Sequence, residues 1–430
     1  MKKAIVVGSG AGGATIAKEL QGKFDVTIVE EGKDFRPFRA NLELIERLKK
    51  THLLFDERMI SLLFPAMKVR ISNGGMVVVN GSGPGGTTTI CTANGIRHDN
   101  DLKAIGINLD REFEELAEEV PISTDHMKLW HDHTQMVFDA CDKMGLHPLP
   151  TPKMAYAGRC ASCGRCVFGC VRGAKWDTRQ FVIRAMEKGA TLVTNAKVRR
   201  LVIESGQVIG VDASIGTQRK FYRADLVVLA AGGLGTPFIL RNSGIECQQR
   251  LFVDPVICIA ARWNGSGQNK EIPMPFIVQR DQFIISPYFD FVSFFFNRRW
   301  NIPSDDIYSL MIKLADSSCG DVRDGKIGKS LSSEDNRIVA EGVFLCKEIF
   351  KSLGIDSDRT FLGTVNAGHP GGMLPLTESE AKTLHHDILP ANLYVADSTL
   401  FPESLGNPPI LTIMAMAKRI GKICLSNADA

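Results

Sequence analysis

The first residues of the chain whose types and spacing could do chemistry are three glycines and a carboxylate: Gly8, Gly10, Gly13 and Glu30. The apolar run from Ala4 to Val7 leads directly into the glycines and predicts a buried parallel strand. Glycines with this spacing allow a tight turn, close approach of a pyrophosphate to the backbone, and close packing of the next helix. A carboxylate that ends the second strand can bind the ribose hydroxyls of an adenosine. We therefore predict a dinucleotide site on a βαβ unit. A bare glycine turn is the alternative, and the motif does not separate FAD from NAD.

A second group of residues with chemical potential is a run of four cysteines: Cys160, Cys163, Cys166 and Cys170. Their CxxCxxCxxxC spacing is that of bacterial ferredoxins, where short gaps bring thiolates around one iron–sulfur cluster. We predict that these four residues are the metal ligands of a 4Fe-4S cluster. A structural zinc site and four free thiols stay open as alternatives, because Val171 replaces the proline that follows the fourth cysteine in ferredoxins and no second run exists.

Two glycine-rich segments farther along the chain resemble the glucose-methanol-choline (GMC) oxidoreductase family. Residues 81–95, GSGPGGTTTICTANG, are similar to the loop that covers the FAD pyrophosphate and the flavin edge in that family. Residues 226–237, LVVLAAGGLGTP, are similar to its signature around a central strand of the FAD domain. Small residues suit such loops because the backbone must touch the cofactor. The resemblance implies FAD as the cofactor, with these binding residues: Gly85, Gly86, Thr87, Thr88, Asn94, Val198, Ala231 and Gly232.

The closing part of the sequence, residues 368–413, resembles the cholesterol-oxidase-like branch of the same family. In that family an aspartate meets the ribityl chain of the flavin, and the next helix points its N-terminus at the flavin ring. The resemblance gives these roles to Asp397 and to the helix that begins near Pro409. A helix N-terminus carries about half a positive charge, which stabilises an anionic reduced flavin. Without the resemblance, Thr412 to Ile423 reads only as an amphipathic terminal helix.

The resemblance also nominates catalytic residues. It assigns to His369 the removal of the hydroxyl proton of an alcohol, a task that suits a side chain with an ordinary pKa near 6.5. Asn407 is nominated as the neighbour that orients the substrate or polarises the flavin edge. Many family members have one residue fewer after this asparagine, so its position stays open. His131 and His133 are not predicted to bind a metal, because residues two apart do not share a helix face.

These assignments predict an FAD-dependent oxidoreductase that oxidises the CH–OH group of an alcohol or polyol by hydride transfer to the flavin. The electrons are predicted to pass to the iron–sulfur cluster and then to a ferredoxin-like or other carrier protein or partner subunit, which favours a dehydrogenase over an oxidase. One alternative is a flavin and iron–sulfur electron-transfer subunit. The other is a reductase of a carbon–carbon double bond in an apolar substrate.

Residues 250–360, which we assign to a substrate domain, contain a run of aromatic residues whose function the sequence leaves open. Its members pack either in a sheet buried on both faces or as the apolar wall of a pocket for an isoprenoid, sterol-like or lipid alcohol. The run comprises Phe283, Tyr288, Phe289, Phe291, Phe294, Phe295 and Phe296.

Composition limits the partners and the compartment. A net charge of +3 without a basic run excludes nucleic acid as a partner. No segment has the roughly 18 to 20 uninterrupted apolar residues of a membrane helix, which leaves peripheral membrane contact open. Eleven cysteines without an export signal predict a reducing, cytoplasmic location.

The length of 430 residues exceeds the roughly 250 to 300 residues of a single core, so more than one domain is expected. The predicted class is α/β with an α+β second domain. Residues 1–100, 190–245 and 360–430 are assigned to an FAD-binding, Rossmann-like domain. Residues 101–189 are assigned to a helical segment with the cysteine loop, and residues 250–360 to a smaller substrate domain with an antiparallel sheet.

Overall fold

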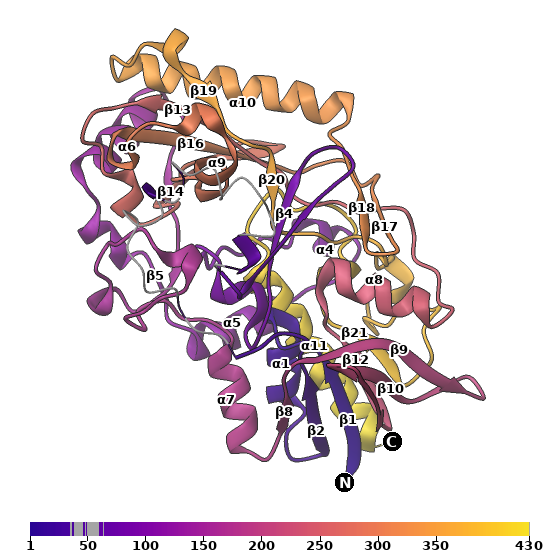
Figure 1. Cartoon of the computed structure of the whole chain (residues 1–430). Coiled ribbons are helices and arrows are strands. Elements are labelled where there is room, and N and C mark those ends of the chain that lie inside the picture. Colours follow the sequence, from indigo (N-terminus) through magenta and orange to yellow (C-terminus); the bar gives the residue numbers. More distant parts are fainter. Residues whose placement is uncertain (35–36, 38–45, 48, 50–59, 63, 430) are drawn as a thin grey trace.

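The fold is given by a computed structural model that describes residues 1–34, 37, 46, 47, 49, 60–62 and 64–429 (Figure 1). Part of the segment 1–100 that was assigned to the cofactor domain lies outside these residues. The chain forms a parallel sheet near its two termini and a large, mostly antiparallel sheet at the other end of the molecule (Figure 1). The predicted α/β class with an antiparallel second sheet is therefore confirmed, and the domain boundaries stay a prediction.

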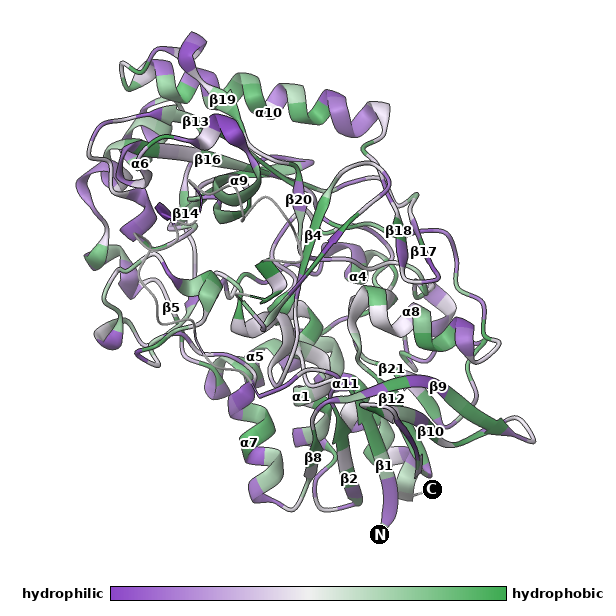
Figure 2. Cartoon of the chain, in the orientation of Figure 1, coloured by the Kyte–Doolittle hydropathy of each residue, from purple (hydrophilic) through white to green (hydrophobic). Residues whose placement is uncertain are grey.

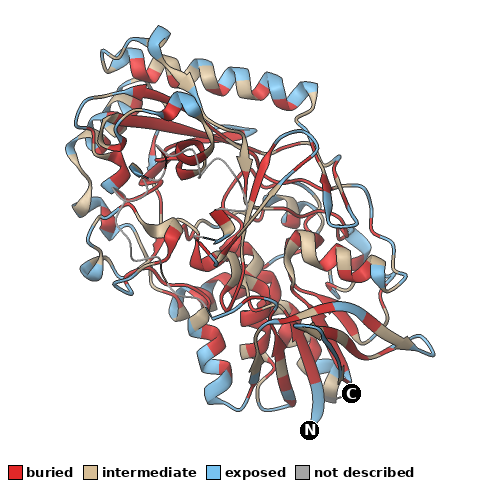
Figure 3. Cartoon of the chain, in the orientation of Figure 1, coloured by how far each residue is buried: buried red, intermediate tan, exposed pale blue. Residues whose placement is uncertain are grey.

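The parallel sheet has the strand order β21-β12-β1-β2-β8. Its strands are β1 (Lys2–Val7), β2 (Phe24–Val29), β8 (Thr191–Val193), β12 (Leu226–Leu229) and β21 (Leu393–Val395). Every neighbouring pair is parallel. The central strands are hydrophobic and buried on both faces (Figures 2 and 3), which is the pattern of a sheet covered by helices on each side. The sheet joins three distant parts of the sequence, and its strands all end at one edge.

Helices cover this sheet and connect its strands. The helices are α1 (Ala11–Glu19), α4 (Asn100–Ala104), α5 (Asp110–Glu119), α7 (Arg179–Glu187), α8 (Gly232–Asn242) and α11 (Ile410–Asp429). α1 packs against α11 and α7, so the first helix of the chain touches the last (Figure 1). A separate antiparallel sheet consists of β9 (Ala196–Glu204), β10 (Gln207–Ile215) and β11 (Gln218–Arg223).

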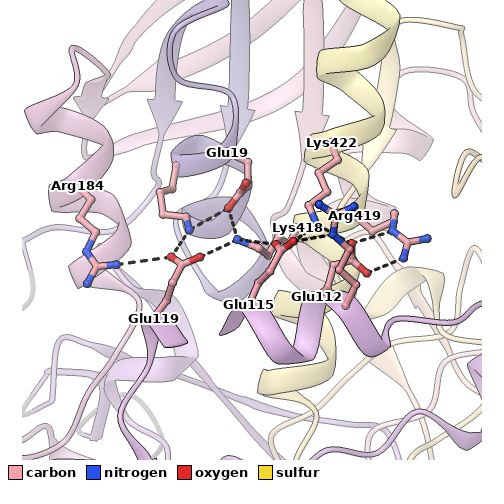
Figure 4. Close-up of polar contacts among 10 residues, drawn as sticks. Glu19, Glu112, Glu115, Glu119, Arg184, Lys418, Arg419 and Lys422 are labelled. Carbon is pink, nitrogen blue, oxygen red and sulfur yellow. Dashed lines mark hydrogen bonds and ion pairs between the residues drawn. The ribbon is translucent and has the colours of Figure 1, made fainter. Parts of the chain in front are cut away.

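An ion network holds α11 against α1 and α5 (Figure 4). The ammonium group of Lys418 lies 2.7 Å from a carboxylate oxygen of Glu119, 2.9 Å from Glu19 and 3.3 Å from Glu115. Burial lowers the pKa of Lys418, but the hydrogen bonds to Glu119 and Glu19 outweigh this effect and leave its pKa raised. The network therefore stabilises the helix whose first turn reaches the cofactor cavity described below.

Replacing Lys418 by methionine should lower the free energy of unfolding by about 1 to 3 kcal/mol. The Lys418 side chain is only 6% exposed, so its loss leaves three carboxylates close together without their shared cation. Denaturant unfolding measures the effect. Lys128→Met is the control, because that side chain is 80% exposed and pairs only with Asp125. Equal stability losses in the two variants would contradict the assignment.

The antiparallel sheet has the order β3-β4-β20-β13-β16-β15-β14-β6, and β19 also pairs with β13. The strands are β3 (Met67–Ile71), β4 (Val77–Gly81), β6 (Leu149–Pro150), β13 (Val256–Arg262), β14 (Phe276–Gln279), β15 (Phe283–Pro287), β16 (Ile307–Leu314), β19 (Phe361–Leu362) and β20 (Asn366–Ala367). α10 (Ser333–Ser352) and α6 (Asp132–Lys143) pack on one face, and an aromatic cluster packs on the other. Two small two-stranded antiparallel sheets complete the fold: β17 (Asp321–Arg323) with β18 (Lys326–Gly328), and β5 (Ile122–Ser123) with β7 (Lys153–Met154).

The aromatic run does not form one sheet. Phe283 lies in β15, whereas Phe291–Phe296 form the helix α9. Asp290 ends the extended segment because its carboxylate accepts a hydrogen bond from the backbone N–H of Val292 and so caps the helix. The sheet interpretation of the run is therefore wrong for residues 291–296. Within the described residues, no helix combines the length and apolar character needed to cross a membrane.

Candidate functional site

A cavity of about 420 Å³ lies at the edge where the strands of the parallel sheet end. The predicted cofactor residues that line it come from seven separate segments of the chain. They are Gly8, Gly10, Glu30, Gly86, Thr87, Thr88, Val198, Ala231, Gly232, Asp397 and Pro409. The structure thus brings together residues that the sequence assigned to one dinucleotide. Gly13, Gly85 and Asn94 do not line this cavity.

The glycine turn fits the predicted ligand at one position in particular. A Cβ atom on Gly13 would lie 2.0 Å from the carbonyl oxygen of Gly8, so this glycine lets α1 pack on the turn. A Cβ atom on Gly10 would meet nothing closer than 3.9 Å, and Gly10 lines the cavity. Gly10 therefore leaves free the space that a pyrophosphate needs at the start of α1.

Glu30 is fixed at the end of β2 by four donors. One carboxylate oxygen accepts hydrogen bonds from the N–H and O–H of Ser9 at 3.1 and 2.6 Å. The other accepts from the N–H groups of Gly32 and Gly83 at 2.8 and 3.1 Å. Glu30 thereby ties the glycine turn to the loop before Gly86. These four donors use the roughly four acceptor positions of a carboxylate, so a ribose hydroxyl would bind Glu30 in place of one of them.

Asp397 is buried at the end of β21 and joins that strand to α8. One of its oxygens accepts hydrogen bonds from the N–H of Gly232 at 2.9 Å and the O–H of Thr236 at 2.6 Å. Burial raises the pKa of Asp397, and these hydrogen bonds oppose the rise. The carboxylate is thus held rigidly against the cavity wall, as a group that contacts a cofactor must be.

The loop predicted to cover the cofactor is held from behind by a buried lysine. Gly85 has a φ of 89°, which a glycine adopts easily, and it precedes the short helical turn η2 (Gly86–Thr89). The Lys175 ammonium donates to the carbonyl oxygens of Thr89 at 2.7 Å and Cys91 at 3.0 Å. It also donates to the carbonyl of Cys166 at 2.9 Å. This contact places the cysteine loop directly against the covering loop.

A second cavity, of about 160 Å³, adjoins the first and is mostly apolar. The two cavities share Thr87, Gly368, His369 and Ile410. The aromatic members of its wall are Phe168, Tyr288, Phe291, Phe295 and Phe296. The wall also includes Asn94, whose amide donates to Met274 Sδ and accepts from Lys153. Part of the aromatic run therefore lines a pocket, which agrees with the second interpretation of that run.

His369 lies where the two cavities meet. Its Nδ1 is buried without a hydrogen-bond partner and lies 3.6 Å from a carboxylate oxygen of Asp254. Burial lowers the pKa of His369, and the nearby Asp254 carboxylate opposes this effect. The ring is therefore neutral near pH 7 and able to accept a proton, as a general base must be.

Asn407, the predicted partner of His369, lines neither cavity. Its side chain is 2% exposed, its Nδ2 makes only a long hydrogen bond of 3.4 Å to the carbonyl of Leu405, and its Oδ1 has no partner. Pro408 lines the apolar cavity in its place. This placement agrees with the extra residue after Asn407 in the sequence, and a catalytic role for Asn407 stays a prediction.

The four cysteines predicted as metal ligands lie in one loop but are not placed to hold a metal ion. Among the described residues, no group of three or more histidine, cysteine, aspartate or glutamate side chains is placed to hold a metal ion. Cys163 is exposed, whereas burial raises the pKa of the Cys166 thiol to about 12. The loop contains backbone hydrogen bonds of its own, such as Gly169 N–H to the carbonyl of Cys166. The structure does not support the predicted cluster.

The sequence analysis missed two charged residues beside His369. Lys313 lines the apolar cavity, and its ammonium group lies 2.5 Å from Asp254 Oδ2. A signal was present, because Lys313 is the one charged residue of β16, IYSLMIKL, whose eight residues are all buried. A lysine in a strand buried on both faces must have a partner or a task.

The helix α9, which forms part of the cavity wall, has a titratable N-cap residue, Asp290, so its contribution to stability should depend on pH. Burial raises the pKa of Asp290 to about 6, although Ser293, Val292 and Asn366 donate hydrogen bonds to it. The folded protein then binds a proton between about pH 4 and pH 6 that the unfolded chain releases, so stability falls as the pH rises through this range. We expect a fall on the order of 2 to 3 kcal/mol, and Asp290→Asn should abolish it. Denaturant unfolding at pH 4 and pH 7 tests this, and identical pH profiles for the two proteins would contradict it.

Comparison with known proteins agrees with this geometry. The model of the GMC oxidoreductase family matches residues 2–260. The uncharacterized protein MJ1450 of Methanocaldococcus jannaschii is 26% identical over 420 residues, which cover 96% of this chain and 97% of that protein. The long-chain-alcohol oxidase FAO4B of Arabidopsis thaliana is 27% identical over 279 residues, which cover 56% of this chain and 34% of the oxidase. The matched region thus spans the whole archaeal relative but about a third of the plant one.

Two solved structures share the fold at 14% sequence identity. Pyridoxine 4-oxidase from Mesorbium loti has a TM-score of 0.73 and aligns over 98% of this chain and 99% of its own. A variant of the formate oxidase of Aspergillus oryzae RIB40 has a TM-score of 0.71 and aligns over 99% and 98%. These likenesses extend over both sheets, and they support the α/β architecture with its antiparallel second part.

Proposed function

Because the chain belongs to the GMC oxidoreductase family, we propose that this FAD-dependent oxidoreductase oxidises the CH–OH group of an apolar alcohol. One observation carries the proposal: His369 stands at the junction between the cavity lined by the dinucleotide residues and the apolar cavity. A base at that position could reach the hydroxyl of a substrate in the apolar cavity while FAD occupied the other cavity. Oxidation of an alcohol by hydride transfer requires this arrangement.

The chain's own residues fit the cofactor. Bound FAD would supply the hydride acceptor. Gly10 leaves room for its pyrophosphate, Glu30 lines the cavity where its ribose is expected, and Asp397 stands where the ribityl chain is expected. Pro409 and Ile410 at the start of α11 line the cavity, so the N-terminus of this 20-residue helix directs its partial positive charge there. That partial charge would lie beside the bound cofactor, and His369 would receive the proton of the alcohol.

The apolar substrate class rests on the second cavity. Its aromatic and aliphatic wall removes water from a hydrocarbon chain, and each buried CH₂ group contributes about 0.8 kcal/mol to binding. The plant relatives, which are named as long-chain-alcohol oxidases, support the same class. The family match ends at residue 260, so the cholesterol-oxidase-like character of residues 368–413 is part of this proposal.

Anaerobic mixing of the FAD-loaded protein with 1-decanol tests the proposal. We expect loss of the visible flavin absorption with 1-decanol and little change with glycerol, a polar alcohol of three carbons. Bleaching by glycerol alone would refute the apolar substrate class. Reduction by neither alcohol, in protein that binds FAD, would refute alcohol oxidation.

The electron acceptor is a separate part of the proposal. The sequence predicts that electrons pass through an iron–sulfur cluster to a carrier protein. The names of the plant relatives, which are oxidases, favour oxygen as the direct acceptor of the electrons. The placement of the cysteines does not support the cluster. Iron and sulfide assays on anaerobically purified protein, with the rate of flavin reoxidation in air, separate a dehydrogenase from an oxidase.

The apolar cavity also suits the second candidate, reduction of a carbon–carbon double bond. The same cofactor would then run hydride transfer in the opposite direction. Photoreduced protein mixed anaerobically with an isoprenoid alkene distinguishes the two activities, since a reductase should regain its flavin absorption and an alcohol-oxidising enzyme should not.

A further inference from the structure

Lys313 is a buried cation that faces the apolar cavity. It lies near the end of β16, its side chain is 2% exposed, and it lines the same cavity as His369. Few features of an apolar binding site are as costly as a desolvated ammonium group, because burial favours its neutral form. A cation that lines such a wall could bind a ligand with an electron-rich atom at that point.

Asp254 explains how the cation is held. This carboxylate is 1% exposed and lies 2.5 Å from the Lys313 ammonium. Ser404 donates a hydrogen bond to its other oxygen. The register between β13 and β16, in which Val256 faces Lys313, brings the lysine beside the residues that precede β13. Because Asp254 also lies 3.6 Å from His369 Nδ1, one carboxylate stands behind both groups that face the cavity.

A second buried pair shows what a purely structural lysine looks like here. Lys329 and Asp316 lie 2.7 Å apart with both side chains fully buried. Ser404 joins the two pairs, because its hydroxyl contacts Asp254 and Asp316. Lys329 lines neither of the two cavities, whereas Lys313 lines the apolar one. The difference between the two lysines is therefore access to the substrate cavity.

We propose that Lys313 is a catalytic residue that binds the substrate oxygen and stabilises the negative charge that develops on it. The inference rests on the proposed alcohol oxidation. As the O–H bond breaks, the proton goes to His369 and the charge on oxygen is held by the Lys313 ammonium. As the C–H bond breaks and the C=O bond forms, the alcohol would lose two electrons as hydride, for which bound FAD would be the acceptor. Lys313 thereby takes the role predicted for Asn407, whose backbone carbonyl oxygen accepts a hydrogen bond from Lys313 at 3.2 Å.

Lys313→Met tests the role, and Lys329→Met is the matched control that removes a buried lysine from the same network. With the FAD-loaded protein, Lys313→Met should slow anaerobic flavin reduction by 1-decanol about 100- to 1000-fold, as the loss of one oxyanion donor does. Lys329→Met should retain the wild-type rate within about threefold below its unfolding temperature. Equal losses in the two variants would show that Lys313 is only a structural residue and would overturn the proposal.

Decanoate binding gives a readout that does not depend on turnover. Its carboxylate places a negative charge where the substrate oxygen is expected, so Lys313→Met should weaken binding about tenfold or more, measured by calorimetry. The double variant Lys313→Met/Asp254→Asn removes both charges, so it leaves no buried carboxylate unpaired and should show the same loss. Unchanged decanoate binding in either protein would refute the oxygen-binding role. If 1-decanol fails to reduce the wild type while decanoate binding still depends on Lys313, the proposed function fails and the anion-binding role of Lys313 stands.

Discussion

Exchanging His369 for glutamine should slow the reduction of the flavin by 1-decanol about 10²- to 10⁴-fold, while FAD stays bound. Glutamine keeps a polar side chain of similar length but cannot accept the hydroxyl proton. The ring stands at the junction of the two cavities, and none of the other histidines that the structure describes lines either cavity. Stopped-flow absorption under anaerobic conditions measures the rate.

His386→Gln is the matched control for this experiment. His386 is also a buried histidine beside a carboxylate, with Nδ1 3.5 Å from Glu380, and it lines neither cavity. The control should retain the wild-type rate. A His369→Gln protein that is reduced within about tenfold of the wild-type rate would remove this histidine from the mechanism and would favour the electron-transfer alternative.

Replacing Gly10 by valine should weaken FAD binding at least about 100-fold, equivalent to about 2.8 kcal/mol, without unfolding the chain. The protein leaves space around this position, since the nearest atom to a built Cβ is 3.9 Å away, and the backbone φ of −73° is ordinary for a branched residue. The added methyl groups should therefore occupy the space of the cofactor without a clash with other atoms of the protein. Purified protein should be colourless, with a melting temperature equal to that of the wild-type apoprotein.

Gly158→Val controls for the substitution itself. No atom lies within 4 Å of a Cβ built on Gly158, and its φ is not positive, so valine is tolerated there and FAD should bind normally. Gly12→Val is the opposite case, because its Cβ would lie 1.6 Å from the carbonyl oxygen of Ala396 and should prevent folding. Yellow Gly10→Val protein with normal FAD affinity would refute the proposed site of the pyrophosphate.

The cofactor cavity could be predicted from the sequence because its recognition residues are grouped in short motifs. Gly8, Gly10 and Glu30 follow from one βαβ unit, and Asp397 follows from the resemblance of the closing segment. Each motif sets its own local backbone, so the residues line the cavity once the strands pair.

The catalytic surroundings could not be predicted in the same way. Lys313 and Asp254 are 59 residues apart and meet only through the register of β13 with β16, which no local pattern specifies. Asn407 was placed from a family spacing that one extra residue alters. The aromatic run was misread in part because Asp290 starts a helix inside it, and a capping aspartate is a weak signal without knowledge of what it caps. The cysteine spacing is specific for ferredoxins, but spacing alone does not make four thiols converge.

The parallel sheet has a consequence for how the protein is made. Its neighbouring strands β12 and β21 are separated by more than 160 residues, and the helix that completes the cavity follows β21. During synthesis the glycine turn leaves the ribosome long before residues 393–413. The nascent chain therefore has the glycine turn of the coenzyme site but lacks β21 and the start of α11. Insertion of the coenzyme must therefore await the synthesis of residues 393–413.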